Sequence, residues 1–272
     1  MNRIGKRCKA LICASILFLC APLAVVRAAD PENAAPAEAV ESPRKWEFVL
    51  GVYGFVPWVN GTSAAGDVTS DLNLTGGDIL NALRFGYFFD AEAIYDNRFS
   101  AMLDVTYANL GGASSSSRGS RIRLTFSEHI VEGRLGYRFV SKGPSWAEAY
   151  AGVRYWDINQ DLSVTGGGPF GITRTGSAGD TWIDPIIGLR GRYGFAHKWG
   201  LIGQGDIGGF GLGSDFSWRA QAGIQRQFQN GLAIDLQYKA LQADFDNGKT
   251  GGNRFVWDVI QHGPVARLSY RF

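Results

Sequence analysis

Residues 85–107 read FGYFFDAEAIYDNRFSAMLDVTY and contain two runs in which every second residue is apolar or aromatic. The first run ends at the pair Asp96-Asn97, and the second begins shortly after it. A period of two is typical of a β-strand with one apolar and one polar face. Two such runs joined by a short polar link predict an antiparallel hairpin.

The same alternation recurs along most of the chain and predicts an all-β protein. Ten strands are expected, at residues 46–58, 82–95, 98–108, 121–140, 146–158, 181–195, 199–209, 214–228, 232–241 and 255–272. If the glycine-rich stretch 199–228 does not form two full strands, the count becomes eight. Either count is even, so the first and the last strand would have their free ends on the same side of the sheet, the side of the short links.

The connections distinguish a membrane barrel from a soluble β-sandwich, which would explain the alternation equally well. Short links alternate with longer ones, at about 59–81, 109–120, 159–181 and 242–254. Short turns on one side and long loops on the other are typical of a transmembrane up-and-down antiparallel β-barrel. The apolar residues of the fourth strand change parity, which predicts a bulge near residues 127–129 or an extension beyond the bilayer.

Aromatic residues stand near both ends of the expected strands. Beside the short links lie Tyr95, Phe99, Phe139, Trp146, Phe195, Trp199 and Phe228. Toward the long links lie Trp58, Tyr107, Phe126, Tyr155, Trp156, Trp182, Phe210, Trp218, Tyr238 and Trp257. Two such belts are expected at the two interfaces of a membrane.

The first 28 residues have the pattern of a cleaved secretory signal peptide, with a basic start, an apolar stretch and Val26-Arg27-Ala28 as the cleavage site. The segment holds five of the 27 Lys and Arg residues, so its removal leaves 22 against 25 acidic residues and no compositional support for a nucleic-acid partner. It also holds all three cysteines, so the exported chain has no thiol. Residues 29–45 are expected to form a flexible periplasmic tail, and residues 46–272 the barrel.

Four segments carry a resemblance to known proteins: residues 184–190, the glycine-rich run 205–215 with Trp218, residues 262–264 and residues 270–272. Together they resemble small outer-membrane β-barrel proteins of Gram-negative bacteria, over about residue 46 to the end. The resemblance implies a bacterial outer-membrane location, with outer-membrane lipid and lipopolysaccharide as surroundings. The alternation of Leu268, Tyr270 and Phe272 is similar to the C-terminal signal read by the barrel-insertion machinery.

The polar parity of the strands predicts a lumen lined by charges of both signs. These residues are Asp90, Glu92, Asp104, Glu132, Glu148, Asp184, Asp206 and Asp235, with Arg84, Arg134, Arg138, Arg154, Arg190, Arg192, Arg219, Lys239, Arg267 and Arg271. The interior of a barrel of eight to ten strands is about wide enough for its own side chains. Paired charges are therefore expected to fill it and to leave no wide aqueous pore.

No catalytic, cofactor or metal site is expected. Residues 203–208 fit Gly-x-Gly-x-x-Gly, but no helix pattern follows, so a dinucleotide site is not indicated. The three histidines form no ligand spacing with one another or with acids. A rim enzyme acting on lipid or peptide would draw on Asp180, Asp184, Asp206, Asp215 and His262, and one sequence does not establish that these residues meet.

Three functions remain open at this point. The first is a non-enzymatic barrel with a filled lumen and a structural or surface-interaction role in its outer loops. The second is a narrow pore for small solutes or ions, and the third is the rim enzyme. The sequence identifies no surface ligand.

Overall fold

The computed structural model describes residues 45–115, 121–165, 173–196 and 198–272. The expected signal peptide, most of the expected tail and His197 lie outside these residues. The elements are β1 (Trp46–Phe55), β2 (Trp58–Ala65), β3 (Val68–Leu74), α1 (Gly76–Ala82), β4 (Leu83–Tyr95), β5 (Phe99–Ser115), β6 (Arg121–Lys142), β7 (Ser145–Thr165), β8 (Thr173–Ala196), β9 (Trp199–Gly208), β10 (Phe216–Gln227), β11 (Leu232–Asp246), the 3₁₀ turn η1 (Gly251–Asn253) and β12 (Phe255–Arg271).

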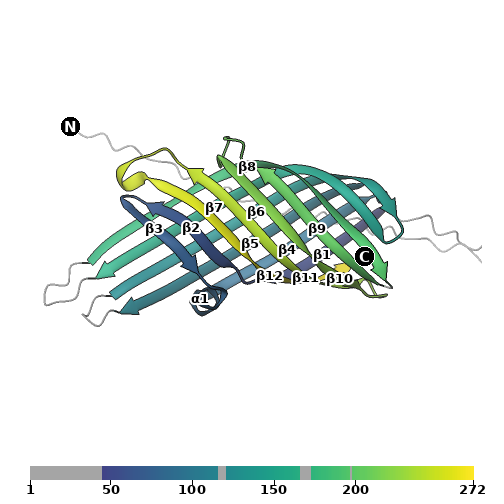
Figure 1. Cartoon of the computed structure of the whole chain (residues 1–272), viewed down its shortest axis with the longest axis horizontal. Coiled ribbons are helices and arrows are strands. Elements are labelled where there is room, and N and C mark those ends of the chain that lie inside the picture. Colours follow the sequence, from purple (N-terminus) through teal and green to yellow (C-terminus); the bar gives the residue numbers. More distant parts are fainter. Residues whose placement is uncertain (1–44, 116–120, 166–172, 197) are drawn as a thin grey trace, which may run out of the picture. The chain divides into compact units, whose positions relative to one another are not determined.

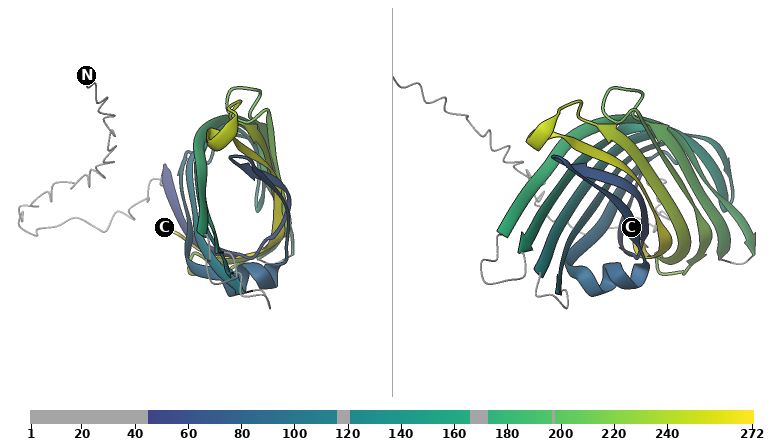
Figure 2. Two further views of the ribbon diagram at one scale, coloured as in Figure 1. Left: turned by 90° about the vertical axis from the view of Figure 1, so that its left-hand side faces the viewer. Right: turned by 60° about the vertical axis from the view of Figure 1, so that its left-hand side comes forward.

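The strands close into one antiparallel barrel (Figures 1 and 2). Strands β4 to β12 pair in chain order, and β1 pairs with both β4 and β12 to close the ring. The β1 strand contacts the C-terminal half of β12, and β2 contacts its N-terminal half, so β1 and β2 form one wall strand interrupted at Val56-Pro57. The prediction of ten strands is confirmed, and the alternative of eight is wrong because β9 and β10 are both paired on each side.

The outer wall of the barrel is apolar and its inner wall is polar or tightly packed. Leu135 and Tyr193 are 72% and 64% exposed on the outside, whereas Arg154 and Glu148, of the opposite parity, are fully buried inside. This is the reverse of a soluble sandwich and fits a wall that faces hydrocarbon. We refer below to the short-turn end, where β1 begins and β12 ends, and to the opposite loop end.

The expected long link 59–81 is structured. It contains the β2–β3 hairpin, which turns at Gly66 with a φ of +61°, and the helix α1. Thr75 and Asp78 form a capping box that starts the helix, because each side chain accepts the other residue's backbone N–H. Among the described residues, no helix is long and apolar enough to cross a membrane.

The predicted bulge near residues 127–129 is wrong. The pairing of β6 with β5 and β7 is continuous there, and the register shifts instead between Arg138 and Val140. The apolar parity changes because Phe126 and Ile130 point inward into an apolar part of the lumen. The interior therefore changes from charged to apolar along the barrel axis.

The belt predicted near the loop end is correct only in part. Trp58 and Tyr238 are 39% and 51% exposed on the outside, but Trp156, Trp182 and Trp257 are almost fully buried. These indoles and Phe126 belong to a buried cluster inside the lumen. Strands β6 to β8 are 21 to 24 residues long, well beyond the roughly ten that cross a bilayer, so their loop-end halves enclose a core of their own.

Candidate functional site

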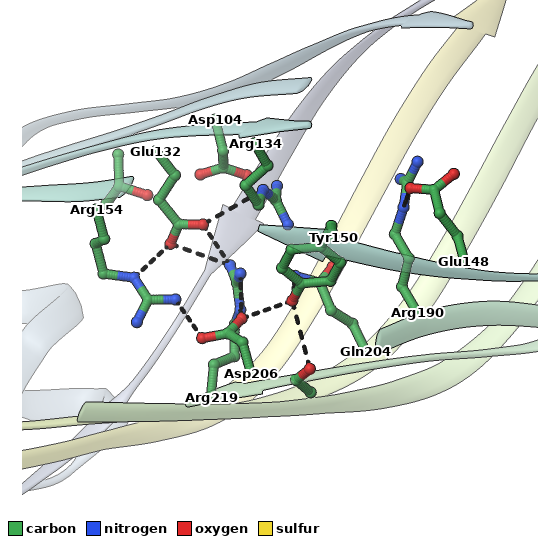
Figure 3. A network of polar contacts seen from close by, with 12 residues as sticks. Asp104, Glu132, Arg134, Glu148, Tyr150, Arg154, Arg190, Gln204, Asp206 and Arg219 are labelled. Atoms are coloured by element: carbon green, nitrogen blue, oxygen red, sulfur yellow. Dashed lines mark hydrogen bonds and ion pairs between the residues drawn. The ribbon is translucent and has the colours of Figure 1, made fainter. Parts of the chain in front are cut away.

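The centre of the lumen is occupied by a ring of two carboxylates and two arginines from four strands, which we call the charge ring (Figure 3). Arg154 lies 2.8 Å from both Glu132 and Asp206, measured between nitrogen and oxygen. On the other side, Arg219 lies 2.9 Å from Glu132 and 2.5 Å from Asp206. The Tyr150 hydroxyl donates to Asp206 at 2.7 Å. Each carboxylate therefore meets two guanidinium groups, and all four charged side chains are at most 5% exposed.

A second group of charges spans the lumen nearer the short-turn end. Arg190 on β8 forms ion pairs with Glu92 on β4 and with Glu148 on β7, the latter at 2.8 Å. Arg138 lies 3.7 Å from Glu148, and the guanidinium groups of Arg138 and Arg190 lie over the ring of Trp146. This group, the transverse bridge, joins β8 to β4, which are separated in the wall by β5, β6 and β7.

A third group is centred on Arg267 of β12. Its guanidinium donates to Asp90 at 2.6 and 2.7 Å and to Asp235 at 2.9 Å. Cutting one partner out of a buried ion pair costs about 3–5 kcal/mol, because it leaves an uncompensated charge. Loss of a single charged partner in any of the three groups should therefore be costly.

The other expected lumen residues are placed as follows. Arg134 lies 3.6 Å from Glu132, and Asp104 accepts from the Tyr53 hydroxyl at 2.9 Å. Arg192 donates to Gln225 and to the carbonyl of Pro144, and Arg271 pairs with Glu47 at the exposed short-turn rim. Arg84 is exposed. Lys239 is 6% exposed and forms no ion pair within the described chain, but its ammonium lies 5.0 Å from the centre of the Phe55 ring.

Asp184 has a different environment, built by the glycine-rich segment that the sequence analysis singled out. Ser214 donates to Asp184 from its backbone N–H at 2.7 Å and from its hydroxyl at 2.9 Å, and the Trp156 indole donates at 3.0 Å. The Trp182 indole donates to the Ser214 hydroxyl at 2.8 Å. A side chain at Gly213 would collide with the Asp184 carboxylate, so glycine permits this approach. The segment thus fastens the β9–β10 connection to β7 and β8.

Above the charge ring, toward the loop end, lies an aromatic cluster. Trp182 stacks on Phe245 at 4.0 Å and on Trp156 at 5.6 Å, and Phe126 stacks on Trp257 at 5.6 Å between ring centres. Offset aromatic pairs at such distances add to the energy of apolar burial. Sequence reasoning missed this cluster because period-two patterning does not reveal which aromatic residues lie beyond the membrane.

Two cavities lie inside the barrel, one on each side of the charge ring. A polar one of about 290 Å³ opens at the short-turn end and reaches Asp104, Arg134 and Arg219. The other, of about 240 Å³, lies in the loop-end half, and we call it the apolar chamber; its wall includes Val59, Leu74, Ile79, Leu110, Ile130 and Trp257. Lys239 contributes to the walls of both.

The residues proposed for a rim enzyme are not brought together as a catalytic unit. His262 contacts Tyr238 and Asn60 through its two ring nitrogens and stacks on Trp58. Asp206 belongs to the charge ring and Asp184 to the Ser214 contact. Residues 203–208 lie in strand β9 rather than at a strand-to-helix turn. Within the described chain, no group of three or more His, Cys, Asp or Glu residues is placed to hold a metal ion.

Comparison with solved structures returns outer-membrane barrels. The outer-membrane protease OmpT from Escherichia coli aligns with a TM-score of 0.49 at 8% identity, covering 86% of this chain and 99% of that one. A major outer-membrane protein from Thermus thermophilus aligns at 0.40 and 14%, covering 84% and 99%. Neisserial surface protein A aligns at 0.30 and 14%, covering 83% and 97%. No family model matches the sequence, and no curated protein matches it.

These likenesses concern the fold and carry no activity with them. The closed barrel, the apolar outer wall and the polar inner wall have been described above from this chain's own residues. On those grounds the chain has the fold of a small ten-stranded transmembrane β-barrel.

Proposed function

We propose that this protein is a non-enzymatic outer-membrane barrel whose lumen is closed to ions by paired charges, with a structural or surface-interaction role. The observation that carries the proposal is the charge ring, in which Glu132 and Asp206 are each held by Arg154 and Arg219 at 2.5–2.9 Å. An ion crossing the barrel would have to displace these contacts. The transverse bridge adds a second obstruction on the same path.

The narrow-pore alternative rests on the polar cavity at the short-turn end. This cavity reaches the charge ring, and the aromatic cluster lies beyond the ring. A conducting state would therefore need the ring to open. The alternative of a rim enzyme has weaker support, since its candidate carboxylates Asp206 and Asp184 already accept hydrogen bonds from Arg154 and Ser214.

The proposal is tested by potassium flux into lipid vesicles that contain the purified protein. We expect no flux above that of protein-free vesicles. The triple variant Glu132→Ala/Arg154→Ala/Arg190→Ala removes one anion and one cation from the ring together with the cation of the transverse bridge, and it should admit potassium. Leu135→Ala, on the lipid-facing side of β6, is the matched control and should stay closed. Potassium flux through the unaltered protein would contradict the proposal.

The C-terminal residues fit a role in assembly, which we include in the proposal. Leu268, Tyr270 and Phe272 are about half exposed on the outer wall near the short-turn end. Phe272 and Phe48 exchange backbone hydrogen bonds at 3.0 and 3.1 Å, which closes the barrel between the first and last strands. A signal read by the barrel-insertion machinery at this seam would couple recognition of the last strand to closure. Outer-membrane lipid and lipopolysaccharide would surround the apolar wall.

A further inference from the structure

The barrel wall is incomplete beside the apolar chamber. Strand β4 pairs with β1 only from Phe89 onward, so among the described residues no strand pairs with 83–88 on that side, although they face β5 on the other. Strand β3 pairs with β2 alone. The short helix α1 connects β3 to β4 beside this gap (Figure 2).

Large apolar side chains of α1 and of the start of β4 lie beside this gap. Ile79 points inward and is buried, and it forms part of the chamber wall. Leu80 and Leu83 also border the chamber, and Leu83 pairs with the inward-facing Leu110. Phe85, after the register shift, is 60% exposed on the outer wall. The gap therefore opens onto an apolar space on its inner side.

The chamber is large enough for an apolar guest. An apolar cavity of about 150 Å³ stays dry and takes up benzene, and this one measures about 240 Å³. Its wall is formed chiefly by aliphatic and aromatic side chains, to which water binds poorly. Burial of a hydrocarbon there would remove apolar surface from water on both partners.

One cation at the inner end of the chamber forms no ion pair with any residue that the structure describes. Lys239 is only 6% exposed, and its ammonium makes no ion pair or hydrogen bond within the described chain. Two carboxylates lie near it but form no ion pair with it: Glu128, which borders the chamber and accepts from Gln261 at 2.6 Å, and Asp104, which accepts from Tyr53 at 2.9 Å. A buried ammonium is costly unless a partner supplies hydrogen-bond acceptors.

We propose that the apolar chamber is a binding site for a medium-chain fatty acid, whose chain lies beneath α1 and whose carboxylate meets the ammonium of Lys239. The ligand would enter through the gap between β3 and β4, near the loop-end margin of the membrane at Trp58 and Tyr238. This site goes beyond the closed lumen proposed above and does not depend on it, because it lies on the loop-end side of the charge ring.

The test is equilibrium binding of radiolabelled dodecanoate to the purified protein in lipid nanodiscs, with protein-free nanodiscs subtracted. We expect saturable binding of one dodecanoate per barrel. Ala108→Phe fills the chamber from β5 and should abolish this binding. Ala101→Phe places the same side chain on the lipid-facing side of β5 and should leave it unchanged. The gel shift between unheated and boiled samples reports that each variant is folded.

The variant Lys239→Met tests the contribution of the ligand's carboxylate separately from that of its hydrocarbon chain. A charge-assisted hydrogen bond contributes about 1.5–3 kcal/mol, so this variant should weaken dodecanoate binding by roughly tenfold to a hundredfold. Binding of dodecanol, which has the same chain but no charge, should change little. Equal loss or equal retention of both ligands in Lys239→Met would overturn the assignment of a carboxylate and favour an acyl chain of a membrane lipid. Identical binding by Ala108→Phe and the unaltered protein would overturn the site itself.

Discussion

Replacement of Glu132 by glutamine keeps the size of the side chain but removes one of the two anions of the charge ring. Two guanidinium groups lie 2.8 and 2.9 Å from its oxygens. With charge centres about 4 Å apart and an effective dielectric constant near 20, each attraction is about 4 kcal/mol. The desolvation of the carboxylate cancels a large share of that sum, so the expected net loss is about 3–5 kcal/mol in the free energy of unfolding.

The assay is urea unfolding of the protein in lipid vesicles, followed by tryptophan fluorescence and by the gel shift. Gly133→Ala is the matched control, because its Cβ meets nothing within 4 Å on the outer wall, and it should change stability by less than about 0.5 kcal/mol. The double variant Glu132→Gln/Arg154→Met restores the charge balance, so it should cost less than the two single changes added together, by about 1–3 kcal/mol. A loss below about 1 kcal/mol for Glu132→Gln, with additive effects in the double variant, would refute the reasoning.

Three further predictions concern other parts of the barrel. Asp184→Asn should lower stability by about 1–3 kcal/mol in the same unfolding assay. The two oxygens of the Asp184 carboxylate together accept three hydrogen bonds, and in asparagine one of these oxygens is replaced by an NH₂ group, which donates. An unchanged unfolding midpoint would contradict this prediction. On α1, hydrogen bonds from the Thr75 hydroxyl and backbone lower the pKa of Asp78 from its usual 3.8, so the cap should stabilise the helix above that pH and lose its effect as the pH falls through the lowered pKa. The protection of the α1 amides, expressed relative to their intrinsic exchange rate at each pH, should therefore fall in acid, and Thr75→Ala should lower it already at pH 7; equal protection in both proteins at pH 7 would count against the cap. Deletion of Phe272 should reduce the fraction of protein that the reconstituted insertion machinery converts to the heat-modifiable form, and an undiminished fraction would argue against the proposed signal.

The strands were predictable because alternation is a local property of the sequence. Residues 85–107 determine a hairpin by themselves, with one face for lipid and one for the lumen. The β2–β3 hairpin and α1 were not predicted, since small residues such as Ala64 and Gly66 give little periodic contrast. A capping box at Thr75 and Asp78 is present in the sequence and could have revealed the helix.

The sequence predicted which charged residues face the lumen, but not which of them form ion pairs with one another. Parity identifies Glu92 and Arg190 as inward-facing, but their ion pair joins residues 98 positions apart and depends on how the barrel closes. The inward tryptophans were misassigned because strands that extend past the membrane no longer need an apolar outer face. The chamber and the gap beside β4 arise from the interruption of the first wall strand at Val56-Pro57, which no periodic pattern reveals.

The closure of the lumen is tested most directly by single-channel recording of the purified protein in a planar bilayer. Insertion of folded protein is established in the same preparation by the gel shift. We expect a flat current at all applied voltages, because the charge ring and the transverse bridge leave no continuous water path. Discrete, reproducible current steps from the unaltered protein would contradict it and identify the barrel as a pore.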